Sequence, residues 1–275
     1  MRDAVIQSCS FWAAVAVYAL STVLHFAGLS FERPRLAGWG RGLAAAGLAP
    51  HACALALRWA EVGHGPWNTR YEVLSSQAFV VVALWLVASV LAPGLRGAGA
   101  LVVPCALLLL GWAVSTFGLK TEVPIVFKSC WLALHVAFAK LFAGSAVLAS
   151  ACAVAYLRKR RRPASLRALP RPEVLDLHAH QLLLLSFLCL GVMIVAGSLW
   201  ANQAWGRYWA WDPMETSSLA TWIAFAVILH LRVLHRWSGP RMAWLTLLAL
   251  AFTATTLYAV AAVVPTIHAS YMVTQ

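Results

Sequence analysis

Charged residues are scarce in this chain, and acidic ones are the scarcest. Of its 275 residues only nine are Asp or Glu and 21 are Lys or Arg, whereas 62% are apolar. A soluble domain of this size needs far more charged surface to remain monomeric. The composition therefore excludes an ordinary soluble protein and indicates one that lies in a lipid bilayer.

Several cysteine and targeting patterns are also missing. The six cysteines form no CxxC pair, so neither a disulfide framework nor a zinc site is indicated, and without a CxxCH the chain is not itself a c-type cytochrome. The apolar amino-terminal stretch has no small-residue cleavage site, so we expect a retained helix. The net charge of +12 does not indicate nucleic acid, because the basic residues lie between apolar runs, where they set membrane topology.

Apolar runs of nearly 20 residues recur along the chain, the length at which an α-helix crosses a hydrocarbon core of ~30 Å. The short alternating segments of a β-barrel are absent. We therefore expect an all-α, polytopic membrane helix bundle of about eight transmembrane helices, forming a single domain over residues 1–275. The expected helices span residues 9–29, 38–59, 73–92, 98–118, 130–156, 177–200, 216–235 and 243–264.

The basic residues predict how the bundle is oriented. Most of them fall in loops on one face of the expected bundle, above all in residues 158–171. Basic loops are retained on the cytoplasmic side. We therefore expect a multi-pass protein of the cytoplasmic (inner) membrane with both termini extracytoplasmic, and with residues 200–215 on the outer face.

An aromatic segment joins the sixth and seventh expected helices, and we expect it to form an outer loop over residues 200–215. It reads SLWANQAWGRYWAWDPMET from Ser198 to Thr216. An aromatic belt at the headgroup level would need neither the internal glycine nor the closing Asp-Pro. A planar apolar ligand would need several rings to stack on and a few polar groups at its edge. Chemistry alone leaves the two interpretations about equally favoured. The candidate ligand-binding residues are Trp200, Trp205, Gly206, Tyr208, Trp209, Trp211 and Asp212.

Two histidines flank this segment near the outer ends of expected helices, His135 and His268. A neutral imidazole is a good ligand for haem iron. A single histidine at a helix end is usually structural, but two histidines that flank a cluster of aromatic rings favour metal ligation. Trp131 lies four residues before His135, on the same helix face, and can pack beside the imidazole or the ligand.

Other polar residues occur deeper in the expected helices. His25 and His230 lie at similar depth near the cytoplasmic leaflet, and we expect His25 to be a packed histidine. For His51, structural hydrogen bonding is favoured over ligation, and His64 is expected to be solvated. Lys140 lies inside the fifth helix with no carboxylate at its own depth, which leaves its partner open.

The aromatic segment closely resembles the WGxYWxWD haem-binding segment (the WWD motif) of the CcsA family (ResC/CcsA-like) of cytochrome c assembly proteins. The matching residues are Trp205, Gly206, Tyr208, Trp209, Trp211 and Asp212. Met214 and Ser217 depart from the family pattern, which usually has Lys and Trp there. The similarity covers most of the chain from His51 onward, including residues 229–232 and 267–271.

The resemblance implies a haem-binding and haem-export subunit of a cytochrome c synthase, which presents haem b at the outer face for thioether attachment to apocytochrome c. It implies His135 and His268 as outer iron ligands and His230 as an inner ligand, with a CcsB/ResB-like membrane partner supplying the second inner ligand. No catalytic residue is assigned, and the chain would be the haem-presenting part of a two-component haem lyase. The alternative is a CcmC-like haem delivery protein, or a HemX-like regulator of tetrapyrrole synthesis, without synthase activity.

Overall fold

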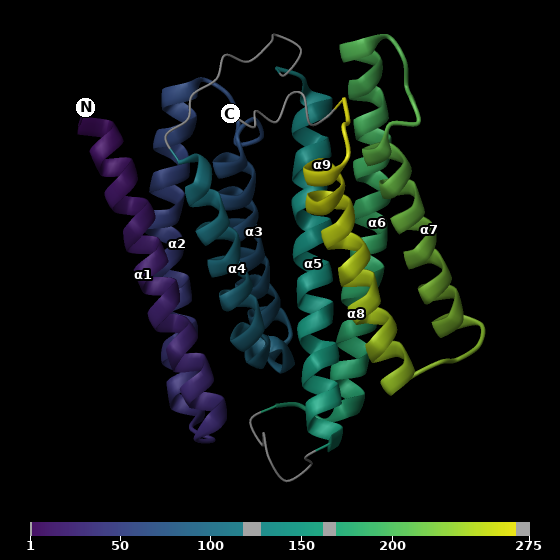
Figure 1. Cartoon of the computed structure of the whole chain (residues 1–275). Helices are drawn as coiled ribbons and strands as arrows, with labels where there is room; N and C mark the ends of the chain where they lie inside the picture. The colour runs from purple at the N-terminus through teal and green to yellow at the C-terminus, as the bar shows by residue number, and fades with distance from the viewer. Residues whose placement is uncertain (1, 118–127, 162–168, 268–275) are drawn as a thin grey trace. The chain divides into compact units, whose positions relative to one another are not determined.

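The structure is a computed structural model that describes residues 2–117, 128–161 and 169–267. Its helices are α1 (Arg2–Ser30), α2 (Pro34–Val62), α3 (Arg70–Leu91), α4 (Gly99–Ala113), α5 (Cys130–Arg161), α6 (Pro172–Trp205), α7 (Pro213–Val233), α8 (Pro240–Ala254) and α9 (Val260–Val263) (Figure 1). Two short 3-10 helices, η1 (Pro93–Ala98) and η2 (Val114–Thr116), flank α4, and a π-helical turn, η4 (Thr255–Ala259), joins α8 to α9. The expected all-α fold with eight helices is confirmed, the eighth being built from α8, η4 and α9.

The chain groups into two compact units. Unit 1 comprises residues 1–120 and 154–175, and unit 2 comprises residues 121–153 and 176–275. Helices α5 and α6 each contribute to both units. The single domain over residues 1–275 stays a prediction, and each unit is described by itself below.

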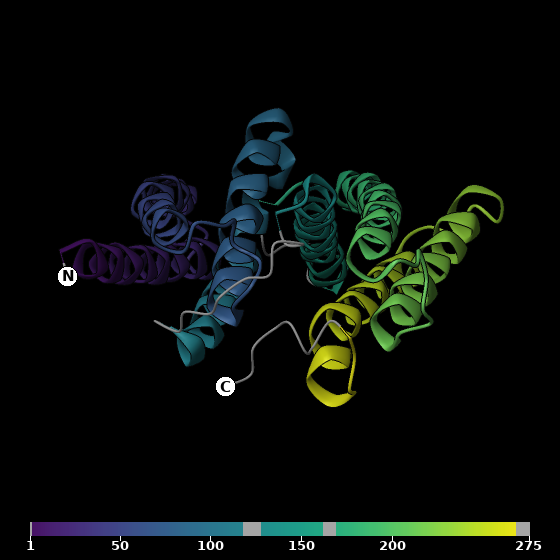
Figure 2. The ribbon, with the colours of Figure 1, turned by 90° about the horizontal axis from the view of Figure 1, so that it is seen from above.

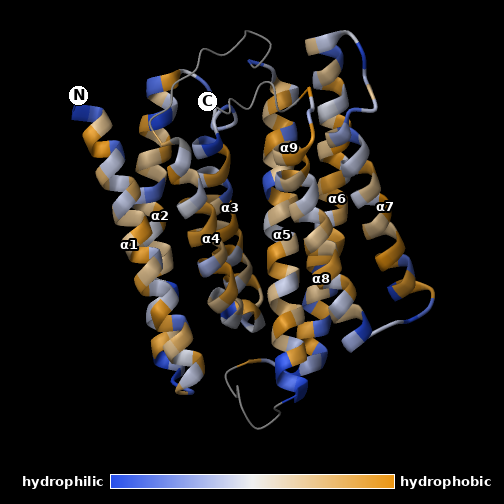
Figure 3. Ribbon diagram, viewed as in Figure 1, coloured by the Kyte–Doolittle hydropathy of each residue, from blue (hydrophilic) through white to orange (hydrophobic). Residues whose placement is uncertain are grey.

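Seven helical stretches in the described part of the chain are long and apolar enough to cross a membrane. Apolar residues run along the lengths of these helices, whereas hydrophilic residues gather at many of their ends (Figure 3). The end of α5 carries four consecutive basic residues, 158–161. The chain is therefore a multi-pass membrane protein, while the orientation of its termini stays a prediction.

Helix α2 is not among those seven stretches, because many of its residues are Ala and Gly and it carries several charges. The small residues let it approach α1 closely, and the two helices lie side by side (Figures 1 and 2). A Cβ atom on Gly47 would lie 2.6 Å from the Tyr18 ring, and one on Gly28 would lie 2.8 Å from the backbone of Ala37. Close packing at small residues is a common way for membrane helices to associate. The lower hydropathy of α2 thus reflects its packing against α1.

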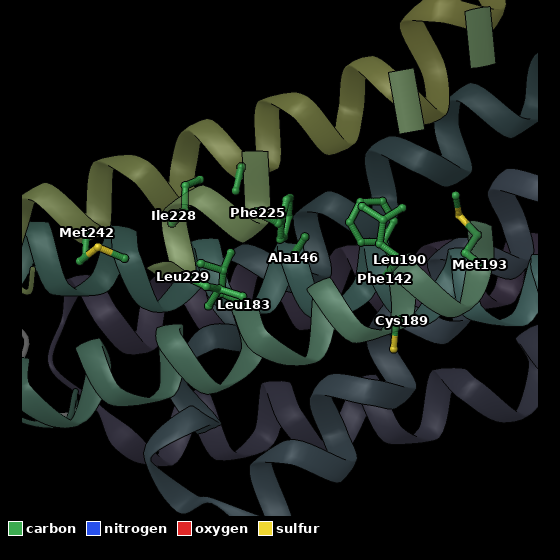
Figure 4. Close-up of a cluster of buried hydrophobic side chains, with 11 residues drawn as sticks. Phe142, Ala146, Leu183, Cys189, Leu190, Met193, Phe225, Ile228, Leu229 and Met242 are labelled. Carbon is green, nitrogen blue, oxygen red and sulfur yellow. The ribbon is translucent and has the colours of Figure 1, made fainter. Parts of the chain in front are cut away.

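The core of unit 2 is apolar and is formed by side chains of α5, α6, α7 and α8 (Figure 4). Phe142 and Phe225 lie near its middle, with ring centroids 5.7 Å apart in an edge-to-face arrangement. The buried hydroxyls of Ser145 and Ser186 pair at 2.7 Å, so α5 and α6 are also joined by a polar contact. This packing fixes α5 and α6 against each other and so positions the residues near the start of α5 and the end of α6.

Candidate functional site

The tryptophan loop is shorter than expected, because α6 continues as far as Trp205. Trp200 and Trp205 lie in the last turns of that helix, with ring centroids 5.0 Å apart in an edge-to-face arrangement. Gly206 then adopts φ +71°, and its N–H donates to the carbonyl of Asn202 at 2.9 Å. Glycine is the usual residue at such a left-handed helix end. We call residues 206–212 the tryptophan loop from here on, since the expected start at Trp200 is wrong.

The tryptophan loop combines a buried indole N–H with exposed rings. Trp209 and Trp211 have ring centroids 5.8 Å apart at 87°. The indole Nε1 of Trp209 is buried and has no hydrogen-bond acceptor among the described residues. Trp211 is 71% exposed and adopts φ +57°, which is strained for a bulky residue, and Tyr208 is also exposed. The loop therefore offers a buried N–H donor and exposed rings, features that suit a ligand with a flat apolar face.

A reciprocal set of hydrogen bonds fixes the end of the loop at the start of α7. The Oδ2 atom of Asp212 accepts from the N–H of Met214 at 3.0 Å. The Oε2 atom of Glu215 accepts from the N–H groups of Ala210 and Asp212, at 2.8 and 3.3 Å. This is a capping box, and Pro213 occupies the first helical position, where its missing N–H costs nothing. Asp212 thus has a structural role at the start of α7.

The second oxygen of Asp212 reaches the carboxyl-terminal segment of the chain. Its Oδ1 atom accepts from the N–H of Ile267 at 2.8 Å. Ile267 directly precedes the predicted iron ligand His268, which lies outside the described residues. The structure therefore ties the tryptophan loop to the residue that comes before this histidine.

The π-helical turn η4 adds a further tie between the last helix and α7. The hydroxyl of Thr256 lies 2.7 Å from that of Thr221 and donates to the carbonyl of Ser217 at 3.2 Å. A π-helical turn holds one more residue than an α-helical turn, and such turns occur frequently at functional sites. The turn places the Thr256 hydroxyl against the first half of α7.

His135 is oriented by helix α6. Its Nδ1 atom lies 2.8 Å from the carbonyl oxygen of Met193, which can only accept, so Nδ1 carries the proton. In that tautomer the lone pair is on Nε2, the arrangement that metal-bound histidines commonly have. A Cβ atom on Gly197 would lie 2.6 Å from Nδ1, so this position of α6 must remain glycine for the ring to fit. Trp131, one turn earlier on α5, is half-buried.

His135 and the tryptophan loop belong to the same end of unit 2. The hydroxyl of Ser129, just before α5, donates to Oε1 of Gln203 in the last turn of α6 at 2.6 Å. Gly197, which packs against His135, is one turn before Trp200. The hydrogen bonds thus join His135 and the start of α5 to the last turns of α6, and they join the tryptophan loop, which follows α6, to the start of α7 and to Ile267.

His230 lies at the opposite end of α7. Seventeen residues separate it from Pro213, which corresponds to about 25 Å along the helix. Its side chain is exposed, and its ring centroid lies 6.0 Å from that of His235. The neighbouring Arg232 forms an ion pair with Asp176 of α6 at 2.6 Å. His230 is therefore not part of the site at the tryptophan loop.

The histidines of α1 and α2 belong to unit 1. His51 has no exposed surface and lies between the hydroxyls of Tyr18 (3.3 Å) and Ser75 (3.1 Å), which confirms the expected structural hydrogen bonding. His25 is also buried, and its ring fits where Cβ atoms on Gly40 and Gly99 would come within 3.0 Å of it. These contacts are those of a packed histidine.

A buried charged cluster in unit 1 was not predicted from the sequence. Arg58 donates from Nε and Nη2 to Oε1 of Glu72, both at 2.9 Å. The Oε2 atom of Glu72 accepts from the N–H groups of Asn68 and Thr69. His64 packs beside this cluster and is buried, so the expectation of a solvated His64 is wrong. The sequence pattern that could have pointed to this cluster is the Thr69-x-x-Glu72 capping box, which precedes an apolar run.

Lys140 of α5 is buried, in agreement with its expected place inside that helix. The arginine nearest in sequence to the aromatic rings is Arg207, which is exposed in the tryptophan loop. Arg70, in unit 1, instead stacks over the ring of Trp112 at 5.9 Å. Arg207 thus belongs to the same loop as the tryptophans, whereas Arg70 belongs to unit 1.

Comparison with known proteins gives matches over most of the chain. A family model described as "Cytochrome C assembly protein" matches residues 67–268. The cytochrome c biogenesis protein CcsA of Gloeobacter violaceus is 30% identical over 300 residues, which cover 87% of this chain and 88% of that protein. CcsA of Chlamydomonas reinhardtii is 33% identical over 199 residues, which cover 69% of this chain and 56% of that protein.

Among solved structures, the cytochrome c haem lyase CcmF resembles the chain with a TM-score of 0.73 at 19% sequence identity. The match covers 93% of this chain and 46% of the CcmF chain, so this chain spans about half of that protein. At this low identity the likeness shows the fold alone. About half of the CcmF chain thus has a fold similar to that of this chain.

Proposed function

The chain belongs to the cytochrome c assembly protein family, and from this premise we propose that it is the haem-binding and haem-presenting subunit of a cytochrome c synthase. Family membership places its role in cytochrome c maturation. The proposal goes further: the outer end of unit 2 holds haem b, and apocytochrome c receives the haem there. The haem is then the substrate of the complex.

The observation that carries the proposal is the orientation of His135. Because its Nδ1–H donates to the carbonyl of Met193, the Nε2 lone pair is the one that can bind a metal, and α6 holds the ring in one position. The close fit against Gly197 further restricts the ring to this position.

The residues around the tryptophan loop fit a porphyrin. Exposed Trp211 and Tyr208 can stack on a flat apolar face, and the buried Trp209 N–H needs an acceptor, which a propionate or carbonyl oxygen supplies. Arg207 is the arginine that we assign to a propionate. His135 and His268 would bind the iron from its two faces. The aromatic residues then hold the macrocycle edge.

Haem supplies two vinyl groups, to which cysteine thiols of apocytochrome c add to form thioether bonds. The residues of this chain contribute positioning rather than acid–base chemistry, and orientation of two reactants can supply several kcal/mol of rate enhancement. Asp212 is occupied by two backbone N–H groups, which leaves it poorly suited to transfer a proton.

We assign His230 to the cytoplasmic end of the haem path. It is exposed on the last turn of α7, so another protein can reach it, and a CcsB/ResB-like membrane partner would supply the second inner ligand. The ~25 Å that separates it from the start of α7 is close to the thickness of a hydrocarbon core. This placement requires an inner-membrane protein with the tryptophan loop facing the extracytoplasmic side.

The test is to purify the chain in detergent from haem-replete cells and to record its absorption spectrum. We expect b-type haem with a low-spin, six-coordinate spectrum. In His135→Gly the six-coordinate fraction and cytochrome c assembly should both fall, by more than about tenfold for assembly, since even residues behind a metal ligand contribute 10–100-fold. Added imidazole should restore the spectrum, because the free molecule can fill the space left by the side chain.

The matched control is His178→Gly, at the opposite end of α6, where the imidazole hydrogen-bonds to Gln181. It should leave the spectrum and assembly unchanged. A chain that stays colourless after addition of haem would refute the proposal. A chain that binds haem but supports no thioether formation with a CcsB/ResB-like partner would instead favour a haem delivery protein or a regulator of tetrapyrrole synthesis.

A further inference from the structure

Asp212 makes two hydrogen bonds to parts of the chain that are 53 residues apart. Oδ2 accepts from Met214 in the first turn of α7, and Oδ1 accepts from Ile267 beyond α9. The side chain is only 6% exposed, so its carboxylate is largely removed from water. A buried carboxylate is tolerated when hydrogen-bond donors replace the water it loses. The N–H of Ile267 is one of those donors.

We propose that Asp212 is a positioning residue whose carboxylate holds the N–H of Ile267 beside the tryptophan loop and so constrains the main chain that leads into His268. This inference rests on the proposed function, in which His268 binds the haem iron. Asp212 would act through the histidine and would not itself touch the haem. The loop that carries the rings and the segment that leads to the iron ligand would share one carboxylate.

Helix capping alone does not explain an aspartate at this position. Ser, Asn and Asp cap helices about equally well, and capping uses only one acceptor atom. A serine hydroxyl at position 212 could still accept from Met214, but it is too short and has too few acceptors to reach Ile267 as well. The second oxygen of aspartate is therefore the atom that the Ile267 contact requires.

The orientation of the carboxylate is itself fixed. The N–H of Asp212 donates to Glu215, so the backbone that carries the side chain is held from within α7. The Thr256 hydroxyl of η4 contacts Ser217 and Thr221 of the same helix. The carboxyl-terminal segment is thus tied to α7 and its capping residue at two points eleven residues apart, Thr256 and Ile267.

The test compares Asp212→Ser with Thr69→Ser, which alters the corresponding capping residue of α3 and leaves its cap in place. In the haem-free protein, amide hydrogen exchange at Ile267 should become about tenfold faster or more in Asp212→Ser, because a hydrogen bond to a charged acceptor is lost. Exchange there should be unchanged in Thr69→Ser. Unchanged exchange at Ile267 in Asp212→Ser would overturn the proposal.

Haem spectra then separate positioning from direct contact. Asp212→Ser should lose low-spin, six-coordinate haem, and imidazole should restore it, since free imidazole needs no tie to the loop. Combined with His268→Gly, Asp212→Ser should cause no further loss. Additive losses would show that Asp212 acts independently of His268 and would overturn the proposal. A wild-type chain that binds no haem would refute the proposed function and this role together, whereas normal haem binding by Asp212→Ser would refute this role alone.

Discussion

The buried ion pair of unit 1 allows a quantitative prediction. Glu72 has no exposed surface and Arg58 is 2% exposed, so Glu72→Gln would leave a guanidinium buried without its carboxylate. Removing one partner of a buried pair costs about 3–5 kcal/mol. At about 2–4 °C per kcal/mol for a protein of this size, the unfolding temperature should fall by about 6–20 °C. Glutamine has nearly the same shape as glutamate, so the fall in unfolding temperature measures the effect of removing the negative charge.

The control is Glu61→Gln, which alters the other carboxylate beside Arg58. Glu61 lies 3.6 Å from the guanidinium and is 26% exposed, so its contribution is that of a partly screened pair, about 1 kcal/mol or less. Tryptophan fluorescence in detergent, followed with temperature, measures both variants. Equal, small shifts for the two variants would refute the reasoning.

A second variant tests whether the penalty comes from the unpaired charge. Adding Arg58→Met to Glu72→Gln removes the buried guanidinium, so the double variant should be more stable than Glu72→Gln alone. If the double variant is less stable by the full sum of the two single losses, the two side chains are not coupled as the 2.9 Å contacts indicate.

Two further predictions follow from other features. Gly197→Ala should lower the low-spin haem fraction, because its Cβ atom would lie 2.6 Å from Nδ1 of His135. The control, Gly191→Ala, should leave that fraction unchanged, since its Cβ atom would meet only the Trp222 indole at 3.2 Å. Equal spectra in the two variants would contradict the expected fit of His135 against Gly197. A reporter fused after Gln275 should be extracytoplasmic, and a reporter inserted at residues 158–162 should be cytoplasmic, because basic loops are retained on the cytoplasmic side. The reverse result would put the tryptophan loop on the wrong side of the membrane for cytochrome c assembly.

The helices could be predicted because the length of each apolar run indicates whether a helix can cross a membrane, and its apolar composition indicates that the helix is removed from water. Where those runs end is less clear from hydropathy: the aromatic residues from Trp200 to Trp205 are equally compatible with a helix end and with a loop. The local signal that decides this is Gly206, whose left-handed conformation ends α6. The sequence contains this signal, although the tryptophans before Gly206 suit a loop as well as a helix end.

In the candidate site, too, residue types and spacing could be predicted from the sequence, whereas contacts between distant parts of the chain could not. His135 and the aromatic residues could be identified by type and spacing. The contacts that orient the imidazole come from Met193 and Gly197, about 60 residues away, and depend on how α5 packs on α6. Likewise the capping box at Glu72 is visible in the sequence, whereas its ion pair with Arg58 requires the packing of two helices.

The π-helical turn η4 has a consequence for the length of the chain. Each residue of an α-helix advances the direction of the next side chain by about 100° and the axis by about 1.5 Å. The five residues of η4 cover nearly the same rotation as four residues of an α-helix, so deleting one of them would restore a regular helix and leave the following residues close to their present direction. A deletion inside α8, where no turn holds an extra residue, would instead rotate everything that follows by about 100° and turn the N–H of Ile267 away from Asp212. One-residue deletions should therefore be tolerated better in η4 than in α8.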